Sequence, residues 1–343
     1  MTIIAIRPYG RFAERWATAL RDRGVETVWV NPFEGDAVGQ FEVCRGFFCA
    51  ISHDRPLDLA YLPGMLDALE VSGLKVFPDR NTRRGFDNKI QQYWLLRRLG
   101  LQVPCSWIFF DEGDAVEFAR EASYPLVFKL ARGAGSQNVQ LVSSVSEGLR
   151  LVRQMFGMGR TAFPAAARLS RAVKMKREEG IRLRDAWNLT RSTLRLLRNS
   201  FSKNNREFGY ILFQKLIDGN DKDYRVTVIG ERAFVFFRGV PDNDFRASGS
   251  GRLLYPDPEE VDHQLIETAF AARDKLGSST VAMDFVKDHE GGGYLLLEFC
   301  FSFIPDAVEG CAGYFNRQLD WIPEQKPPEF WIVEDFLKSI ENQ

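Results

Sequence analysis

The chain has 343 residues, of which 45% are hydrophobic and 27% are charged, and its formal net charge is −1. These values are typical of a soluble globular protein with two or three domains, at roughly 150 residues per domain. No apolar run approaches the roughly 20 residues that span a bilayer, and the N-terminus shows no signal-peptide pattern, so we expect a cytoplasmic protein.

The cysteines and histidines exclude two further classes. The chain has five cysteines, an odd number, and no two of them form a CxxC pair. This argues against a disulfide framework and against a zinc site. With only three histidines in the chain, catalysis by a histidine base or a His-Cys metal centre is disfavoured.

The first 105 residues alternate strand and helix signals, a pattern typical of a parallel sheet with helices on its faces. No G-x-G-x-x-G motif follows the first strand, which disfavours a Rossmann dinucleotide site. The expected strands are residues 3–7, 25–30, 46–51 and 75–79, and the expected helices are residues 12–24 and 62–73.

A lysine and a glycine-rich loop follow this part of the chain. Residues 88–100 form an expected amphipathic helix that begins near Lys89, and a connector and a second helix lead to the apolar strand 125–129. That strand ends at Lys129, opens into the sequence ARGAGSQN and is answered by the strand 139–144. Bare backbone N–H groups beside a lysine suit a polyphosphate. Taken alone, however, this segment favours a plain hairpin, and it is not a Walker A loop.

Residues 157–207 differ sharply from the rest in charge. They contain 13 Lys or Arg against 4 Asp or Glu, a net charge of +9. One helical stripe is formed by Trp187, Thr190, Leu194, Leu197 and Phe201. We favour a basic helical insertion packed on its own domain or on the partner of a homodimer; the alternative is a surface that binds anionic lipid or another polyanion. Nucleic acid is not an expected partner.

The last part of the chain predicts an antiparallel sheet with one helix and a terminal helix. A hairpin turn is expected at residues 289–293. The expected strands are residues 210–217, 223–230, 232–240, 280–286 and 293–303, and the expected helices are residues 263–277 and 327–340.

Two carboxylates lie on neighbouring apolar strands of this sheet. Asp284 lies within VAMDFV and Glu298 within LLLEFC. Buried carboxylates repel one another unless a cation lies between them, and Mg²⁺ prefers a few carboxylate oxygens together with substrate phosphates. The alternative is that each carboxylate pairs with a nearby arginine.

Taken in order, these segments resemble the ATP-grasp superfamily and are similar to its ribosomal-protein glutamate ligase-like carboxylate–amine ligases. A softer similarity, in EFCFSF and CAGYFNRQLDW, is to the group associated with polysaccharide biosynthesis. The segments that carry the resemblance are DNK (87–89), YPLVFK (124–129), FQKLI (213–217), DYRV (223–226), DFRASG (244–249), MDFV (283–286) and LEF (297–299).

The resemblance implies an α/β (α+β) protein with the ATP-grasp fold. Residues 1–105 would form an N-terminal α/β pre-ATP-grasp domain. Residues 106–217 would form a central ATP-binding glycine-loop subdomain that carries the helical insertion, and residues 218–343 a C-terminal antiparallel-sheet subdomain with the metal site.

It also implies roles for particular residues. Lys89 and Lys129 would hold phosphates, and Asp284 and Glu298 would bind Mg²⁺, with Mn²⁺ as an alternative. The remaining implied contacts are Gly133, Gly135 and Ser136 over the phosphates of ATP; Gln214, Lys215 and Ile217 at the adenine; Asp221 or Asp223 at the ribose; and Arg238 and Arg246 as catalytic residues at the γ-phosphate and the acyl phosphate.

The implied activity is an ATP-dependent ligase that joins a small-molecule carboxylate to an amine through an acyl phosphate, with an amino acid or amino sugar as substrate. Cys300 departs from the family, which commonly has Asn there, and a thiol is a poor ligand for Mg²⁺. The alternatives are an ATP-grasp small-molecule kinase and an inactive nucleotide-binding module. A lipid-linked substrate would place the enzyme peripherally at the inner face of the membrane.

Overall fold

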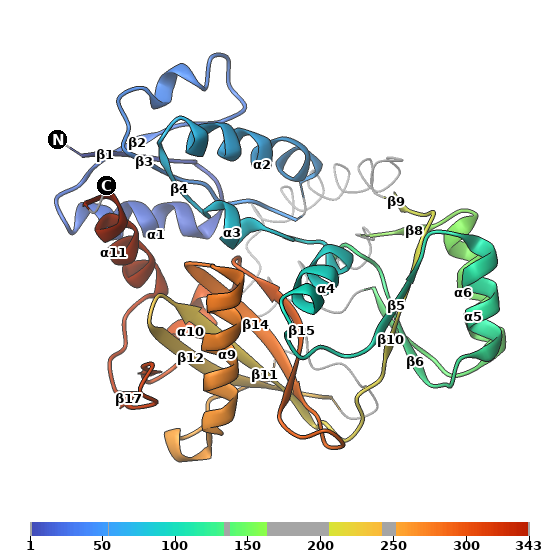
Figure 1. The fold of residues 1–343 in the computed structure, drawn as a ribbon. Helices are drawn as coiled ribbons and strands as arrows, with labels where there is room; N and C mark the ends of the chain where they lie inside the picture. The colour runs from blue at the N-terminus through green and yellow to red at the C-terminus, as the bar shows by residue number, and fades with distance from the viewer. Residues whose placement is uncertain (1, 54, 134–137, 163–205, 242–251, 342–343) are drawn as a thin grey trace, which may run out of the picture. The chain divides into compact units, whose positions relative to one another are not determined.

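The computed structural model describes residues 2–53, 55–133, 138–162, 206–241 and 252–341 (Figure 1). The chain forms two compact units. The larger unit comprises Met1–Phe86, Gln91–Val103 and Ile217–Gln343, and the smaller unit comprises Asp87–Ile90 and Pro104–Leu216. The predicted division into three domains stays a prediction.

A parallel four-stranded sheet opens the larger unit, as the alternating pattern predicts. Its strands follow the order β2-β1-β3-β4, and buried aromatic side chains such as Trp16 and Phe48 pack against it. The elements are β1 (Ile3–Ile6), α1 (Gly10–Arg21), β2 (Glu26–Trp29), η1 (Gly39–Phe41), β3 (Gly46–Phe48), α2 (Pro56–Val71), β4 (Lys75–Phe77) and α3 (Arg80–Arg83).

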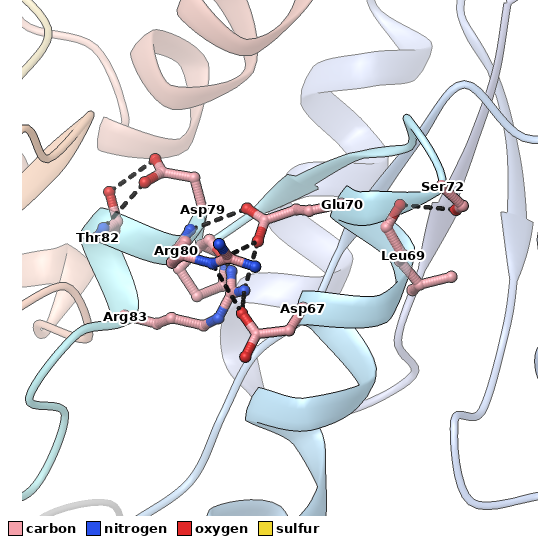
Figure 2. Close-up of polar contacts among 9 residues, drawn as sticks. Asp67, Leu69, Glu70, Ser72, Asp79, Arg80, Thr82 and Arg83 are labelled. Atoms are coloured by element: carbon pink, nitrogen blue, oxygen red, sulfur yellow. Dashed lines mark hydrogen bonds and ion pairs between the residues drawn. The ribbon is translucent and has the colours of Figure 1, made fainter.

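Figure 2 shows how α3 is fixed to α2. Arg83 donates to the Asp67 carboxylate at 2.6 Å and also to Glu70, while Arg80 donates to Asp67 at 3.1 Å. The Asp79 side chain caps α3 by accepting from the Thr82 backbone N–H at 2.9 Å. This network anchors the chain shortly before it enters the smaller unit.

The second sheet of the larger unit has seven strands in the order β15-β14-β11-β12-β16-β17, with β13 paired to β12. One face packs against α9 and the other contributes to the core shared with α1 and α11. The elements are β11 (Lys222–Ile229), β12 (Arg232–Gly239), β13 (Leu253–Leu254), η3 (Pro258–Glu260), α9 (His263–Leu276), β14 (Thr280–Lys287), β15 (Tyr294–Cys300), α10 (Pro305–Glu309), β16 (Tyr314–Phe315), β17 (Trp321–Ile322) and α11 (Pro328–Glu341).

The smaller unit contains an antiparallel sheet in the order β5-β10-β6-β7, which confirms the predicted hairpin of β6 and β7. Its core is lined by residues of α5 and α6, and α4 begins in this unit. The elements are α4 (Lys89–Arg98), β5 (Ser106–Phe109), α5 (Glu112–Glu121), β6 (Leu126–Lys129), β7 (Val139–Val142), α6 (Val145–Phe156), β8 (Arg160–Thr161), β9 (Arg206–Glu207) and β10 (Ile211–Lys215).

Several local features differ from the sequence predictions, and three of them concern the longer elements. Strand β5 lies in the segment that was read as a connector, α2 begins six residues earlier than expected, and α6 was not predicted. Ser144 caps α6 by accepting from the Glu147 N–H, a capping pattern visible in the sequence SVSE. Within the described residues, every helix is too short or too polar to cross a membrane.

Candidate nucleotide and metal site

A lysine at the end of β6 is held by a neutral side chain. The Lys129 ammonium group donates to Oε1 of Gln214 on β10 at 2.6 Å, and the Gln214 amide nitrogen donates to the Ser106 hydroxyl of β5 at 2.9 Å. The amide is thereby oriented with its oxygen toward the lysine. This hydrogen bond sets the position of the Lys129 ammonium group, a cation of the kind that binds phosphate.

A second lysine holds the start of the glycine-rich segment. The Lys89 ammonium group donates to the Gly133 carbonyl at 2.6 Å, and the Lys89 backbone N–H donates to the Ala131 carbonyl at 2.9 Å. Gly133 has a φ of 116°, a conformation that other residues adopt only with strain. The structure therefore brings Lys89 and Gly133 together, whereas Gly135 and Ser136 lie outside the described residues.

In the larger unit, charged side chains share one face of the seven-stranded sheet. Arg238 of β12 binds Asp223 of β11 through two hydrogen bonds, Nε to Oδ1 at 2.7 Å and Nη2 to Oδ2 at 2.5 Å. The same Nη2 lies 2.8 Å from Oδ2 of Asp284 on β14. Such charge-assisted contacts with two carboxylates fix the guanidinium in place.

A second arginine reaches the same aspartate. Arg225 lies directly opposite Asp284 in the register of β11 and β14. Its Nη2 donates to Asp284 Oδ2 at 3.1 Å, and its Nε makes a close ion pair with Oδ1. The pairing of Asp284 with arginine, one of the two readings of the sequence, is therefore seen in the structure. Sequence reasoning missed Arg225, although its spacing of two from Asp223 in DYRV places both on one face of a strand.

Burial sets the electrostatics of this cluster. Asp284 is 2% exposed, Asp223 is 5% exposed and Arg238 is 9% exposed. Burial and the nearby Asp284 carboxylate raise the pKa of Asp223, against the hydrogen bond from Arg238 that lowers it. Burial alone would lower the pKa of the Arg238 guanidinium, but Asp284 and Asp223 outweigh this effect and raise the pKa. Arg238 therefore stays cationic, and its charge is shared between two carboxylates.

The two predicted metal ligands face each other across neighbouring strands. Asp284 of β14 pairs in register with Glu298 of β15, beside a β-bulge. Among the described residues, no three His, Cys, Asp or Glu side chains are grouped closely enough to hold a metal ion by themselves. Two carboxylates nevertheless fit Mg²⁺, which takes its remaining ligands from phosphates and water. Arg225 and Arg238 compete for the Asp284 oxygens, so a metal ion would have to displace part of this pairing.

Cys300 ends β15 two residues after Glu298. Its thiol is half-buried and lies 3.2 Å from both the backbone N–H and the backbone carbonyl of Ser302. The thiol is thus engaged with the backbone, as expected for a structural cysteine rather than for a ligand of a hard cation.

The remaining predicted residues occupy more exposed places. Lys215 at the end of β10 and Asp221 are exposed, and Ile217 is half-buried. The Asp221 backbone carbonyl accepts from the Val240 N–H at 2.8 Å, which fixes the turn before β11. Arg246 lies outside the described residues. These assignments stay predictions.

No family model matches the chain, but its sequence is similar to those of LysW ligases. It is 24% identical over 232 residues to glutamate--LysW ligase ArgX of Sulfolobus acidocaldarius, covering 67% of this chain and 66% of that protein. It is also 24% identical over 273 residues to alpha-aminoadipate--LysW ligase LysX of Saccharolobus solfataricus, covering 78% of this chain and 74% of that protein.

Solved structures show the fold. A RimK domain ATP-grasp protein from Sphaerobacter thermophilus superposes with a TM-score of 0.57 at 15% identity, covering 97% of this chain and 98% of that chain. The ATP-grasp ligase PsnB, complexed with a minimal precursor, Mg and ADP, gives a TM-score of 0.54 at 16% identity, covering 98% and 97%. These comparisons confirm the predicted fold and the predicted resemblance to ligases that form C–N bonds.

Proposed function

Since the chain has the ATP-grasp fold and resembles the ribosomal-protein glutamate ligases, we propose that it is an ATP-dependent carboxylate–amine ligase. One observation carries the proposal. In the smaller unit Lys89 and Lys129 are fixed at the glycine-rich segment, and in the larger unit Asp284 and Glu298 lie side by side on a sheet that also fixes Arg238. These residue types supply what phosphoryl transfer needs, which is alignment and charge neutralisation.

The lysines bind the phosphates of ATP. Lys129, held by Gln214, and Lys89, held by the Gly133 carbonyl, each present an ammonium group whose position is already set. The backbone of 214–217 contacts the adenine edge and Asp221 or Asp223 the ribose, while Gly135 and Ser136 close over the phosphates. Positions fixed before binding reduce the entropy lost when the nucleotide binds.

Asp284 and Glu298 would hold Mg²⁺, with Mn²⁺ as an alternative, and the ion would supply positive charge for the phosphate oxygens of the nucleotide. Arg225 and Arg238 contact the Asp284 carboxylate and so fix its orientation. A carboxylate with a fixed orientation is well suited to bind a hard cation.

The reaction proceeds in two steps. A substrate carboxylate oxygen attacks the γ-phosphorus, the bond from that phosphorus to the bridging oxygen breaks, and ADP leaves. The amine nitrogen then attacks the acyl carbon, phosphate leaves, and the nitrogen loses a proton as the amide forms. Arg238 and Arg246 stabilise the negative charge on the transferred phosphoryl group. No protein nucleophile is required, in keeping with the scarcity of histidine in the chain.

Glutamate and α-aminoadipate, which appear in the names of the two LysW ligases, are the first amino acids to test as substrates. Amino sugars form the second class, because of the softer similarity to proteins of polysaccharide biosynthesis. The carboxylate partner is proposed to be a small molecule.

The basic segment 157–207 is proposed to pack on its own domain or on the partner of a homodimer, with a peripheral location at an anionic membrane as the alternative. Its net charge of +9 would be attracted to such a surface. In that alternative, deletion of residues 163–205 is expected to reduce cosedimentation with vesicles that contain phosphatidylserine. If the deletion leaves cosedimentation unchanged but converts a dimer into a monomer, the homodimer contact is supported and the membrane proposal is lost.

The function is tested by ADP release from Mg-ATP with pairs of carboxylates and amines, beside Asp284→Ala and Glu298→Ala variants. Turnover that requires both substrates and disappears in both variants supports the ligase. A phosphorylated product that accumulates with no need for an amine indicates a kinase. ATP binding without turnover in any mixture supports the inactive binding module, which the departure at Cys300 favours.

A further inference from the structure

The glycine-rich segment is held by side chains at its entrance. The backbone N–H groups of Ala131, Arg132 and Gly133 each donate to an oxygen of a different residue. Ala131 donates to the Tyr210 hydroxyl at 2.7 Å, Arg132 donates to the Glu207 carboxylate at 3.2 Å, and Gly133 donates to Asp87 Oδ1 at 2.9 Å. Three successive residues are thus fixed by side chains from two distant parts of the chain.

These contacts begin where the strand pairing stops. Strand β6 ends at Lys129, and the Leu130 N–H still donates to the Asn138 carbonyl at 3.2 Å. Beyond that point backbone donors need other partners, because a buried N–H without an acceptor is costly. These partners are the side chains of Tyr210, Glu207 and Asp87, each of which accepts from one N–H group.

The acceptors are themselves fixed. Tyr210 and Glu207 are each 8% exposed, and the Tyr210 ring is part of the core of the smaller unit. The Tyr210 hydroxyl donates to the Glu207 carboxylate in a close contact while it accepts from Ala131. Burial raises the pKa of both groups, the hydroxyl additionally through the charge of Glu207. A buried pair whose members bond each other and the backbone has little freedom to move.

Two of the three acceptors are carboxylates, which is unexpected beside a phosphate site because carboxylates repel phosphate. Glu207 accepts from the Arg132 N–H, and Asp87 accepts from the Gly133 N–H. The Gly133 carbonyl in turn accepts from Lys89. Acidic groups near a bound polyanion weaken its binding through charge repulsion. Their presence here is explained by the backbone conformation that they stabilise. Arg132 offsets part of this charge, since its Nε lies 3.6 Å from Asp87 Oδ2.

We infer that Tyr210, Glu207 and Asp87 are positioning residues that hold 131–133 in the conformation that receives the phosphates of ATP. This inference rests on the proposed function. Tyr210 and Glu207 fix the first two residues of the turn, and Asp87 fixes Gly133, whose carbonyl in turn fixes Lys89. The three side chains touch neither substrate nor reacting atoms in this role.

The test compares Tyr210→Phe with Tyr124→Phe. Tyr124 is a matched control, because its hydroxyl donates to the Ala119 carbonyl at 2.6 Å in the same unit, away from 131–133. In the protein without nucleotide, loss of the Tyr210 hydroxyl is expected to speed amide hydrogen exchange at 131–133 about tenfold, the equivalent of one hydrogen bond. The KM for Mg-ATP is expected to rise about tenfold with kcat within about a factor of two, and Tyr124→Phe should change neither quantity.

Glu207→Gln provides a second variant that keeps shape and an acceptor oxygen. It is expected to raise the KM for Mg-ATP by a smaller factor than Tyr210→Phe. If both variants leave hydrogen exchange and KM as in the wild type, the inference is overturned while the ligase proposal stands. If the wild-type protein fails to bind Mg-ATP by calorimetry, the proposed function is lost and the inference falls with it.

Discussion

The two units fix their cationic side chains in different ways. In the smaller unit, Lys129 and Lys89 donate to an amide oxygen and to a backbone carbonyl, both neutral acceptors. In the larger unit, Arg225 and Arg238 are paired with the carboxylates of Asp223 and Asp284. The first set of contacts consists of hydrogen bonds to neutral oxygens, whereas the second consists of ion pairs between arginines and buried carboxylates.

The difference shows which of the two clusters depends more on its own ion pairs for stability. A buried cation whose carboxylate is removed leaves an uncompensated charge, while a lysine whose neutral acceptor is removed can regain solvent. Substitutions in the arginine cluster should therefore reduce both stability and activity. Substitutions at the lysines should reduce nucleotide binding and leave the fold nearly unchanged.

The largest effect is expected for Asp284→Asn. Because Arg225 and Arg238 both lose a charged partner, the free energy of unfolding should fall by about 3 kcal/mol. Magnesium-dependent ADP release should fall by about 10²-fold or more. Urea denaturation with Asp335→Asn as the control measures the first effect, since Asp335 pairs with Arg232 on a more exposed part of the same unit. Equal stability losses in the two variants would contradict the special role of the buried cluster.

Lys129→Met should weaken Mg-ATP binding by about 10- to 100-fold, the value of one charge-assisted contact with phosphate. The midpoint of urea denaturation should hardly move, since the Lys129 side chain is only partly buried. Lys275→Met is the matched control, because Lys275 Nζ also lies near a carbonyl, that of Gly100, at 3.4 Å. Calorimetric titration measures the affinity. A stability loss without a change in affinity would reverse the expected contrast between the units.

Gln214→Glu tests the neutral acceptor itself. A carboxylate there would pair with Lys129 and compete with phosphate, so the KM for Mg-ATP should rise about threefold to tenfold. Gln140→Glu provides the comparison, because Gln140 Oε1 accepts from Arg160 at 2.9 Å in the same unit. An unchanged or lower KM in Gln214→Glu would show that neutrality at this position is unimportant.

The smallest effect concerns an exposed pair. The hydrogen bond from Arg317 is the main influence that lowers the pKa of Asp274 to about 2. The stabilisation is present above the unfolded-state pKa and is lost as pH falls through the folded-state value. Asp274 is 43% exposed, so Asp274→Asn should cost less than about 1 kcal/mol at pH 7. Urea denaturation at pH 7 and pH 3 should show a smaller difference from the wild type at pH 3 and at high salt.

Much of the fold could be predicted from the sequence, because the apolar periodicities and the turn residues agree with it. The alternation over the first 105 residues gave the parallel sheet, and the turn at 289–293 was confirmed by the Asp288 side chain, which accepts from the N–H groups of Glu290 and Gly291. Strand β5 was missed because the segment from Leu101 to Phe110 contains a proline and lacks strict alternation, and its strand character comes from pairing with β10.

Only part of the candidate site could be predicted from the sequence. Lysines and carboxylates in apolar strands stand out in the sequence, and the structure places Lys89 at Gly133 and Asp284 opposite Glu298. Arg225 and Tyr210 were missed, because their partners lie 59 and 79 residues away in the sequence. Such pairings leave no local pattern in the sequence, because they form only when the strands come together in the fold.

The short antiparallel pair β8 and β9 joins two parts of the chain that are far apart in the sequence. Arg160 pairs with Glu207 and Thr161 with Arg206. Since the cost of closing a loop grows only slowly with its length, we expect this pair to accept a shorter or longer connection between its strands. Because Glu207 also accepts from the Arg132 N–H, we expect such a change of connection to alter hydrogen exchange at residues 131–133.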